Sequence, residues 1–191
     1  MTTDIVVIGN GPSVLERRVG ALIDKFETVV RINNYVTTGY EEHVGNKVDV
    51  WTRSGSDAVF DRADEHIPAV LWFVPLRAWE AIRQRIGPIT QRVDAAGPNH
   101  TLVERQRIED LIRRYFHGRT DVRPTTGLFT ICHYLETHER VHIHGFDFFA
   151  THRTKLHYFD DETKKRMNGH DVEFEREIVQ EHLRAGRLVT I

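Results

Sequence analysis

The stretch that decides the fold is Asp4-Ile5-Val6-Val7-Ile8-Gly9-Asn10-Gly11-Pro12-Ser13. Four β-branched residues in a row are typical of a buried strand, and the Gly-Asn-Gly-Pro segment after them is typical of a tight turn. From 14 to 26 the apolar residues fall at helical spacing, which predicts a helix there. Ser13 is its expected N-cap, with Glu16 as the second half of a capping box.

Strand and helix patterns alternate along the rest of the chain. Gly87-Pro88 and Gly97-Pro98 punctuate a connection after 85, and the charged, aperiodic segment 150–169 is expected to be a long loop. We therefore predict one α/β domain over residues 1–191, with a mostly parallel sheet and helices on both faces. Strands are predicted over 29–33, 48–52, 69–74, 141–146 and 187–191, and helices over 56–66, 76–85, 101–116, 127–136 and 172–185.

Composition excludes several classes of protein. The chain has 191 residues and a formal net charge of −2, which argues against a dedicated nucleic-acid binder. Cys132 is the one cysteine, so no disulfide within the chain is possible. No signal peptide is visible before the first strand, and no apolar stretch approaches the roughly 20 residues of a membrane-spanning helix. We expect a soluble, cytoplasmic protein.

Two segments are candidates for holding a nucleotide or a phosphate. The turn containing Asn10 and Gly11 would present backbone N–H groups at the carboxyl end of the first strand. Asn33 would emerge at the same edge of the sheet, where carboxamides can bind a base or a ribose. A tight turn without a ligand, and turn residues at Asn33, are the alternatives.

A third segment, Arg123-Pro124-Thr125-Thr126-Gly127-Leu128, leads into a predicted helix. Hydroxyl and free N–H groups at a helix start suit a phosphate or a ribose. The alternative, an N-cap role for Thr125 or Thr126, is equally compatible with the local sequence.

The fourth segment contains the histidines His157 and His170, with Tyr158 and Glu175 nearby in the sequence. One histidine near a phosphate and another near an acceptor hydroxyl would suit group transfer. A metal site at His157, His170 and Glu175 is the alternative, but their spacing matches no zinc pattern. His142 and His144 share one face of a strand, and we interpret them as packing or solvent-facing residues.

Taken in order, these segments resemble the eukaryotic-type sialyltransferase family. Residues 7–47, including Gly20, Asp24, Arg31 and Gly45-Asn46-Lys47, resemble the large sialylmotif. Residues 123–147 resemble the small motif. His157-Tyr158 is similar to the third motif, and His170 with Glu175 fits the very small one.

The resemblance implies a Rossmann-like glycosyltransferase fold of the A type, a CMP-sialic acid donor, a glycan acceptor, no metal and inversion at the anomeric carbon. It implies that His170 is the general base and His157 bonds the donor phosphate. Glu175 would stabilise the very small motif without contacting the substrate. The residues implied to line the nucleotide site are Asn10, Gly11, Asn33, Thr125, Thr126, Gly127 and Tyr158.

This sequence also departs from the animal members, which carry a membrane anchor, a stem and a disulfide. Thr137 stands near where the second cysteine would fall. We infer a minimal bacterial or viral version that acts on the cytosolic side. Residues 52–122 and 150–169 are expected to select the acceptor, whose identity the sequence does not specify. Another CMP-activated ulosonic acid, such as Kdo, would suit the same nucleotide site.

Two other functions compete with this interpretation. A nucleotide- or flavin-dependent oxidoreductase would fit the strand–glycine–helix opening, but it needs a third glycine where Val14 stands and an acidic residue where the chain has Asn33. A binding module that holds CMP without catalysis is the second alternative.

Overall fold

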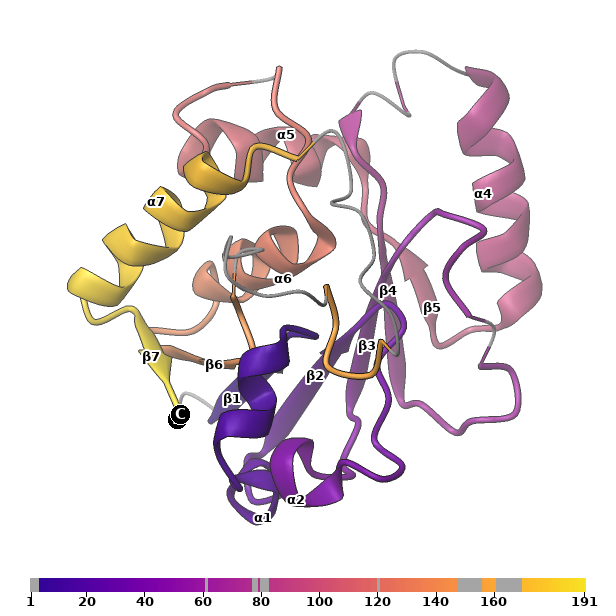
Figure 1. Cartoon of the computed structure of the whole chain (residues 1–191). Coiled ribbons are helices and arrows are strands. Elements are labelled where there is room, and N and C mark those ends of the chain that lie inside the picture. Colours follow the sequence, from indigo (N-terminus) through magenta and orange to yellow (C-terminus); the bar gives the residue numbers. More distant parts are fainter. Residues whose placement is uncertain are drawn as a thin grey trace.

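The computed structural model describes residues 4–60, 62–76, 79, 83–119, 121–147, 156–160 and 170–191. Seven parallel strands form one sheet in the order β5-β4-β3-β2-β1-β6-β7 (Figure 1). This confirms the α/β fold and makes the sheet entirely parallel in the described residues. The strands are β1 (Ile5–Ile8), β2 (Thr28–Ile32), β3 (Val50–Ser54), β4 (Ala69–Phe73), β5 (His100–Leu102), β6 (Val141–His144) and β7 (Leu188–Thr190).

The strand order reverses at β1. β2 pairs with one edge of β1 and β6 pairs with the other, so the chain winds outward in both directions from this strand. Ligands of open α/β sheets bind at such a switch point, outside the carboxyl ends of the strands. The loop that follows Ile8 therefore occupies the expected position for a binding site.

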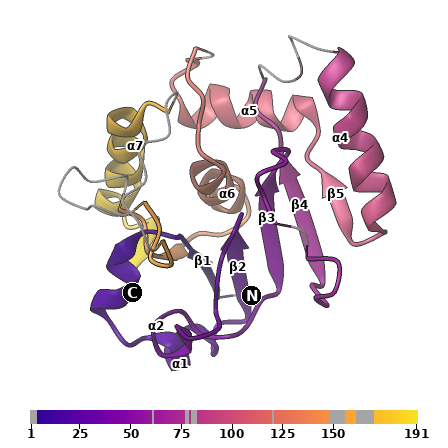
Figure 2. The same cartoon turned by 45° about the vertical axis from the view of Figure 1, so that its right-hand side comes forward.

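Helices cover both faces of the sheet, as predicted (Figure 2). Along β1, Ile5 and Val7 belong to the core under α5, α6 and α7, whereas Val6 and Ile8 belong to the core on the opposite face. The helices whose bounds lie in the described residues are the 3₁₀ helix η1 (Pro12–Glu16) and the α-helices α1 (Gly20–Ile23), α2 (Glu41–Val44), α4 (Arg83–Ala96), α5 (Arg105–Tyr115), α6 (Thr126–Leu135) and α7 (Val172–Arg184).

The helix predicted over 14–26 is wrong, because η1 and α1 occupy this stretch instead. Ser13 is not a helix cap: Gly11 has that position, and the backbone N–H of Ser13 donates to Asp147 at 2.9 Å. A Cβ on Gly20 would lie 1.9 Å from the carbonyl oxygen of Glu41. The first residue of α1 must therefore be glycine, because α2 packs directly on the backbone of Gly20.

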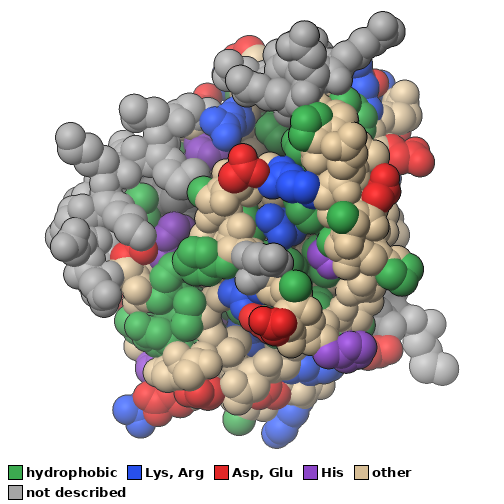
Figure 3. Space-filling model, turned by 90° about the vertical axis from the view of Figure 1, so that its right-hand side faces the viewer, with side chains coloured by type: hydrophobic (Ala, Val, Ile, Leu, Met, Phe, Trp, Pro, Cys, Tyr) green, Lys and Arg blue, Asp and Glu red, His purple; other side chains and the backbone are tan. Residues whose placement is uncertain are grey.

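The helix predicted over 56–66 is also wrong; the described residues there form turns. The side chain of Asn34 holds this segment, since it accepts from Phe60 N–H at 2.7 Å and donates to the carbonyl of Ala58 at 2.9 Å. Nearby, the guanidinium of Arg53 lies 3.9 Å from the ring centre of Trp72 and 4.7 Å from that of Trp51. Figure 3 shows both basic and acidic side chains on the face of the molecule that lies on the right in Figure 1.

Two boundaries differ from the prediction because tertiary packing overrides local sequence. Gly87-Pro88 lies inside α4, where Ile89 and Val93 are buried against the aromatic side chains of β3 and β4. The helix predicted from 101 starts at Arg105, since His100–Leu102 pairs with β4 as the edge strand β5. The loop predicted over 150–169 lies outside the described residues except for 156–160.

Candidate functional site

The candidate site is built on the loop after β1. Gly9 N–H donates to the His144 carbonyl at 2.7 Å, and Gly11 N–H donates to the Gly145 carbonyl at 2.9 Å. A Cβ on Gly9 would lie 2.4 Å from the Gly145 oxygen. The loop needs glycine at this position because its backbone packs directly on the chain that leaves β6.

Asn10 lies between the ends of β1 and β2. Its Nδ2 donates to the Ile32 carbonyl at 3.0 Å. Its Oδ1 is buried and has no hydrogen-bond partner among the described residues. A buried acceptor without a donor is costly, so this oxygen is suited to receive an N–H or O–H group of a ligand.

Asn33 follows β2 in the left-handed region, with φ of 47°, which asparagine tolerates better than most residues. Its Oδ1 accepts from Ser54 N–H at 2.9 Å, and its carbonyl accepts from the Trp51 indole at 2.9 Å. Asn33 therefore has the turn role that was the alternative to ligand binding. A contact of this side chain with a ligand would come from the amide nitrogen.

Thr125 is the N-cap of α6, as the alternative interpretation had it. Its Oγ1 accepts from Leu128 N–H at 3.1 Å and donates to Glu175 Oε2 at 2.7 Å, while its N–H donates to Glu175 Oε1 at 2.8 Å. A Cβ on Gly127 would lie 3.0 Å from the Phe146 ring and 3.6 Å from Ile32. The first turn of α6, with Thr126 as its first residue, therefore lies beside the end of β2.

Glu175 is 4% exposed and comes from the first turn of α7. Burial raises the pKa of its carboxyl to about 7, against the opposing effect of the two hydrogen bonds from Thr125. This glutamate thus connects α7 to the start of α6.

His170 precedes α7, and its Nδ1 lies 2.6 Å from the carbonyl oxygen of Arg123. A carbonyl can only accept, so Nδ1 carries the proton and Nε2 carries the lone pair of a neutral ring. Burial lowers the pKa of this imidazole, and the Arg123 carbonyl opposes that effect. Glu175 Oε1, at 3.9 Å, is too far from Nδ1 for a hydrogen bond.

Tyr158 is buried and anchors the segment 156–160 to the first loop. Its N–H donates to the Asn10 carbonyl at 3.0 Å, and its hydroxyl is hydrogen-bonded to both the N–H and the carbonyl of Val36. The hydroxyl is thus occupied by backbone groups, and the ring packs edge-on against Tyr40 and Phe159. His157, the preceding residue, is half-buried, with its Nδ1 3.1 Å from Asp160 Oδ2.

The structure thus gathers the predicted residues into two groups. One group surrounds the Asn10 loop and includes Asn33, His157 and Tyr158; the other surrounds the start of α6 and includes His170 and Glu175. Gly127, packed against Ile32, links them. Sequence reasoning missed Asp147 and Asp160, although Asp147 follows a predicted strand and Asp160 lies three residues after His157.

A metal site receives no support from the described residues, where no three His, Cys, Asp or Glu side chains gather. His142 stacks edge-on against Phe26, with 4.9 Å between ring centres, and His144 Nδ1 lies 3.2 Å from the Ile191 carbonyl. The packing interpretation of this pair is therefore confirmed. No helix within the described ranges has the length and apolar character needed to cross a bilayer.

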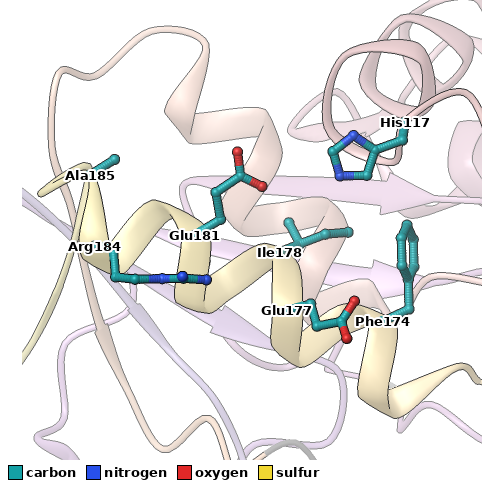
Figure 4. Close-up of a pocket in the computed structure, with 7 residues that line it drawn as sticks. All are labelled: His117, Phe174, Glu177, Ile178, Glu181, Arg184 and Ala185. Carbon is teal, nitrogen blue, oxygen red and sulfur yellow. The ribbon is translucent and has the colours of Figure 1, made fainter.

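A surface hollow lies elsewhere, on α7 (Figure 4). His117 and Phe174 face each other across it, and Glu177, Ile178, Glu181, Arg184 and Ala185 complete its lining. It contains none of the residues predicted for the site.

Comparison with known proteins identifies the family. The model of Glycosyltransferase family 29 (sialyltransferase) matches residues 3–186, and the chain belongs to this family. The CMP-N-acetylneuraminate-beta-galactosamide-alpha-2,3-sialyltransferase 4 of Rattus norvegicus is 26% identical over 216 residues, covering 95% of this chain and 62% of that relative. The lactosylceramide alpha-2,3-sialyltransferase of the same species is 26% identical over 215 residues, covering 95% and 54%. The family assignment displaces the oxidoreductase alternative.

Solved structures show the same fold. A mammalian sialyltransferase in complex with Gal-beta-1-3GalNAc-ortho-nitrophenol superposes with a TM-score of 0.72 at 18% identity, over 100% of this chain and 69% of that one. A second crystal structure of a mammalian sialyltransferase gives a TM-score of 0.70. The chain therefore has the Rossmann-like fold of these enzymes, while it spans only about 54–62% of the length of the relatives named above.

Much of the large motif that carries the resemblance is scaffold. Arg31, fully buried, donates from Nε to the Lys47 carbonyl at 2.9 Å and from Nη2 to the Val44 carbonyl at 2.8 Å. The Asp24 carboxylate accepts from the N–H groups of Asn46 and Lys47, each at 2.9 Å. These residues fix the α2 segment against β2 and lie outside the loop that follows β1.

Proposed function

We propose that this chain transfers sialic acid from CMP-sialic acid to a glycan hydroxyl, with inversion at the anomeric carbon. The observation that carries the proposal is the hydrogen bond from His170 Nδ1 to the Arg123 carbonyl, beside the start of α6. In the neutral ring, which burial favours, this bond places the proton on Nδ1 and the lone pair on Nε2, as a general base requires. Family membership supplies the donor class, since the relatives' names specify CMP-N-acetylneuraminate and sialyl transfer.

The nucleotide would bind across the ends of β1 and β2. Asn10 Oδ1 would accept from the base or the ribose, and the amide nitrogen of Asn33 would complete that side. The backbone N–H of Gly11, which the sequence offered to the ligand, is instead donated to the Gly145 carbonyl. The start of α6 at Thr126 and Gly127 offers N–H groups and the positive end of a helix dipole to the phosphate.

Transfer would be a single displacement. His170 Nε2 takes the proton from the acceptor hydroxyl while that oxygen forms a bond to the anomeric carbon. On the opposite side the bond from this carbon to the phosphate oxygen breaks, and CMP leaves with the electron pair. His157 stabilises the charge that develops on the leaving phosphate.

This mechanism does not require a metal, because CMP is a monophosphate leaving group met by a histidine and a helix start. We therefore expect transfer to continue in EDTA. CMP-Kdo is the alternative donor, because the residues proposed for the nucleotide would contact only the CMP part, which the two donors share. The relatives' names specify a beta-galactosamide and lactosylceramide, so acceptors ending in β-galactose are the first to screen.

A binding titration tests the nucleotide site. In EDTA, CMP is expected to raise the melting temperature of the wild type, whereas UDP and NAD are not. Asn10→Ala should weaken CMP binding on the order of tenfold, the usual effect of losing a hydrogen bond to a ligand. Asn46→Ala is the matched control, because Asn46 is exposed in the α2 segment. Stabilisation by NAD or UDP, or equal effects of both variants, would contradict the proposal.

A further inference from the structure

The segment that carries His157 contains a second buried carboxylate. The Asp160 side chain is 1% exposed, and its Oδ2 accepts from the backbone N–H of His157 at 3.0 Å and lies 3.1 Å from His157 Nδ1. In return, Asp160 N–H donates to the His157 carbonyl at 3.2 Å. The two residues thus form a closed turn in which one carboxylate oxygen contacts both the backbone and the ring.

This contact sets the state of the ring. A carboxylate is acceptor-only, so the hydrogen bond requires a proton on His157 Nδ1. The Phe159 ring stacks on the imidazole with 5.1 Å between centres and an angle of 4°, which fixes the plane of the ring. A phosphate would therefore be met by Nε2, which can donate a hydrogen bond only when the ring carries both protons.

A buried carboxylate favours that doubly protonated form. An anion within hydrogen-bond distance stabilises the imidazolium, and the effect is stronger where water is excluded. The turn is also fixed in place, because Tyr158 N–H is bonded to the carbonyl of Asn10 in the nucleotide loop. The ring is thus held beside the loop where the donor phosphate is expected.

We propose that Asp160 is a positioning residue that holds His157 as a cation with its Nε2–H directed at the leaving phosphate. The inference rests on the proposed function, since it assumes a CMP donor. Asp160 does not touch the substrate; it acts through His157, in the way that carboxylates behind metal-bound histidines fix the ring and its tautomer.

The test compares CMP with cytidine, which lacks the phosphate. For Asp160→Asn, CMP affinity and kcat are expected to fall on the order of tenfold to a hundredfold, the range for carboxylates that orient a histidine, while cytidine affinity stays unchanged. Asp160→Glu should recover part of the loss. In a His157→Ala background, Asp160→Asn should have no further effect. Asp57→Asn, at an exposed aspartate paired with Arg92, is the matched control and should behave as wild type.

Equal loss of CMP and cytidine affinity in Asp160→Asn, or a full additional loss in the His157→Ala background, would overturn the inference and indicate a purely structural aspartate. Wild type that discriminates CMP from UDP and NAD would still support the proposed function in that case; wild type that does not bind CMP would overturn both. If Asp160→Asn fails to fold, ¹H–¹⁵N NMR of the wild type with CMP decides: a protonated Nδ1 and Nε2 on His157 is expected, and a neutral ring contradicts the inference.

Discussion

His170 and Glu175 have environments that keep each of them closer to neutral than the free side chain would be. Burial lowers the pKa of the imidazole and raises that of the carboxyl to about 7. A neutral histidine can accept a proton, whereas an ionised one cannot. The two shifts therefore make separate predictions, one for activity and one for stability.

The shift at His170 predicts the acid side of the pH profile. Because its pKa lies below 6.5, the base stays unprotonated to lower pH than an ordinary histidine. The rate kcat/KM should therefore fall on acidification with a midpoint below pH 6.5. Steady-state kinetics between pH 5 and 8 measures it, and a midpoint above 6.5 would contradict the environment described for His170.

The shift at Glu175 predicts how stability depends on pH. The folded protein binds this proton up to about pH 7, whereas the unfolded chain releases it near 4.5, so the contribution of Glu175 to the free energy of unfolding decreases between those values. Glu175→Gln removes this titration. The free energy of unfolding of this variant, relative to wild type, should rise by about 3 kcal/mol from pH 4.5 to pH 8. Urea unfolding at both pH values measures the difference, and a constant difference would contradict it.

At the scale of elements, α6 and α7 depend on one threonine. Thr125→Val removes the N-cap of α6 and leaves the Glu175 carboxyl without its hydroxyl donor. We expect a loss of about 1–3 kcal/mol in the free energy of unfolding. Thr137→Val is the matched control, since Thr137 is exposed at the end of the same helix. Equal stability of the two variants would show that the cap contributes nothing.

The close contact of α1 with α2 gives another prediction. In Gly20→Ala the new methyl group would overlap the Glu41 carbonyl, so the free energy of unfolding should fall by about 1–3 kcal/mol or more. Ala21→Ser, at the exposed neighbouring position, should change it by less than about 0.5 kcal/mol. Thermal unfolding of the two variants measures the contrast, and an unchanged Gly20→Ala would contradict the packing.

Elements dominated by local pattern were predictable from the sequence. The β-branched runs gave β1, β2, β4 and β6 close to their observed bounds, and the amphipathic pattern gave α7. The errors arose where distant residues decide. Asn34 holds residues 56–60 in turns, and pairing with β4 makes His100–Leu102 a strand. At the first loop, the Asp147 carboxylate accepts the Ser13 N–H, whereas the Ser13 side chain was expected to cap a helix.

At the scale of the whole molecule, the parallel sheet explains why segments far apart in the sequence converge. Parallel strands bring the ends of β1 and β2 to one edge of the sheet, and the strand order switches at β1, the position where ligands of open α/β sheets bind. The order of motifs predicted one site, and the fold places these residues in two groups, around the Asn10 loop and around the start of α6. The sequence did not predict that the Thr125 hydroxyl donates to Glu175 or that the Tyr158 hydroxyl is bonded to Val36, because hydrogen-bond partners depend on the folded geometry.

The measurement that tests the central claim most directly is an assay of sialic acid transfer from CMP-sialic acid to a β-galactoside in EDTA. The released CMP and the sialylated product are both quantified. Wild type and His66→Ala, a variant of an exposed histidine, should both form sialylated product. His170→Ala should lose on the order of a hundredfold or more in kcat while retaining CMP affinity. Product formation by His170→Ala at the wild-type rate, or CMP binding by wild type without any turnover of the sugar nucleotide, would contradict the account.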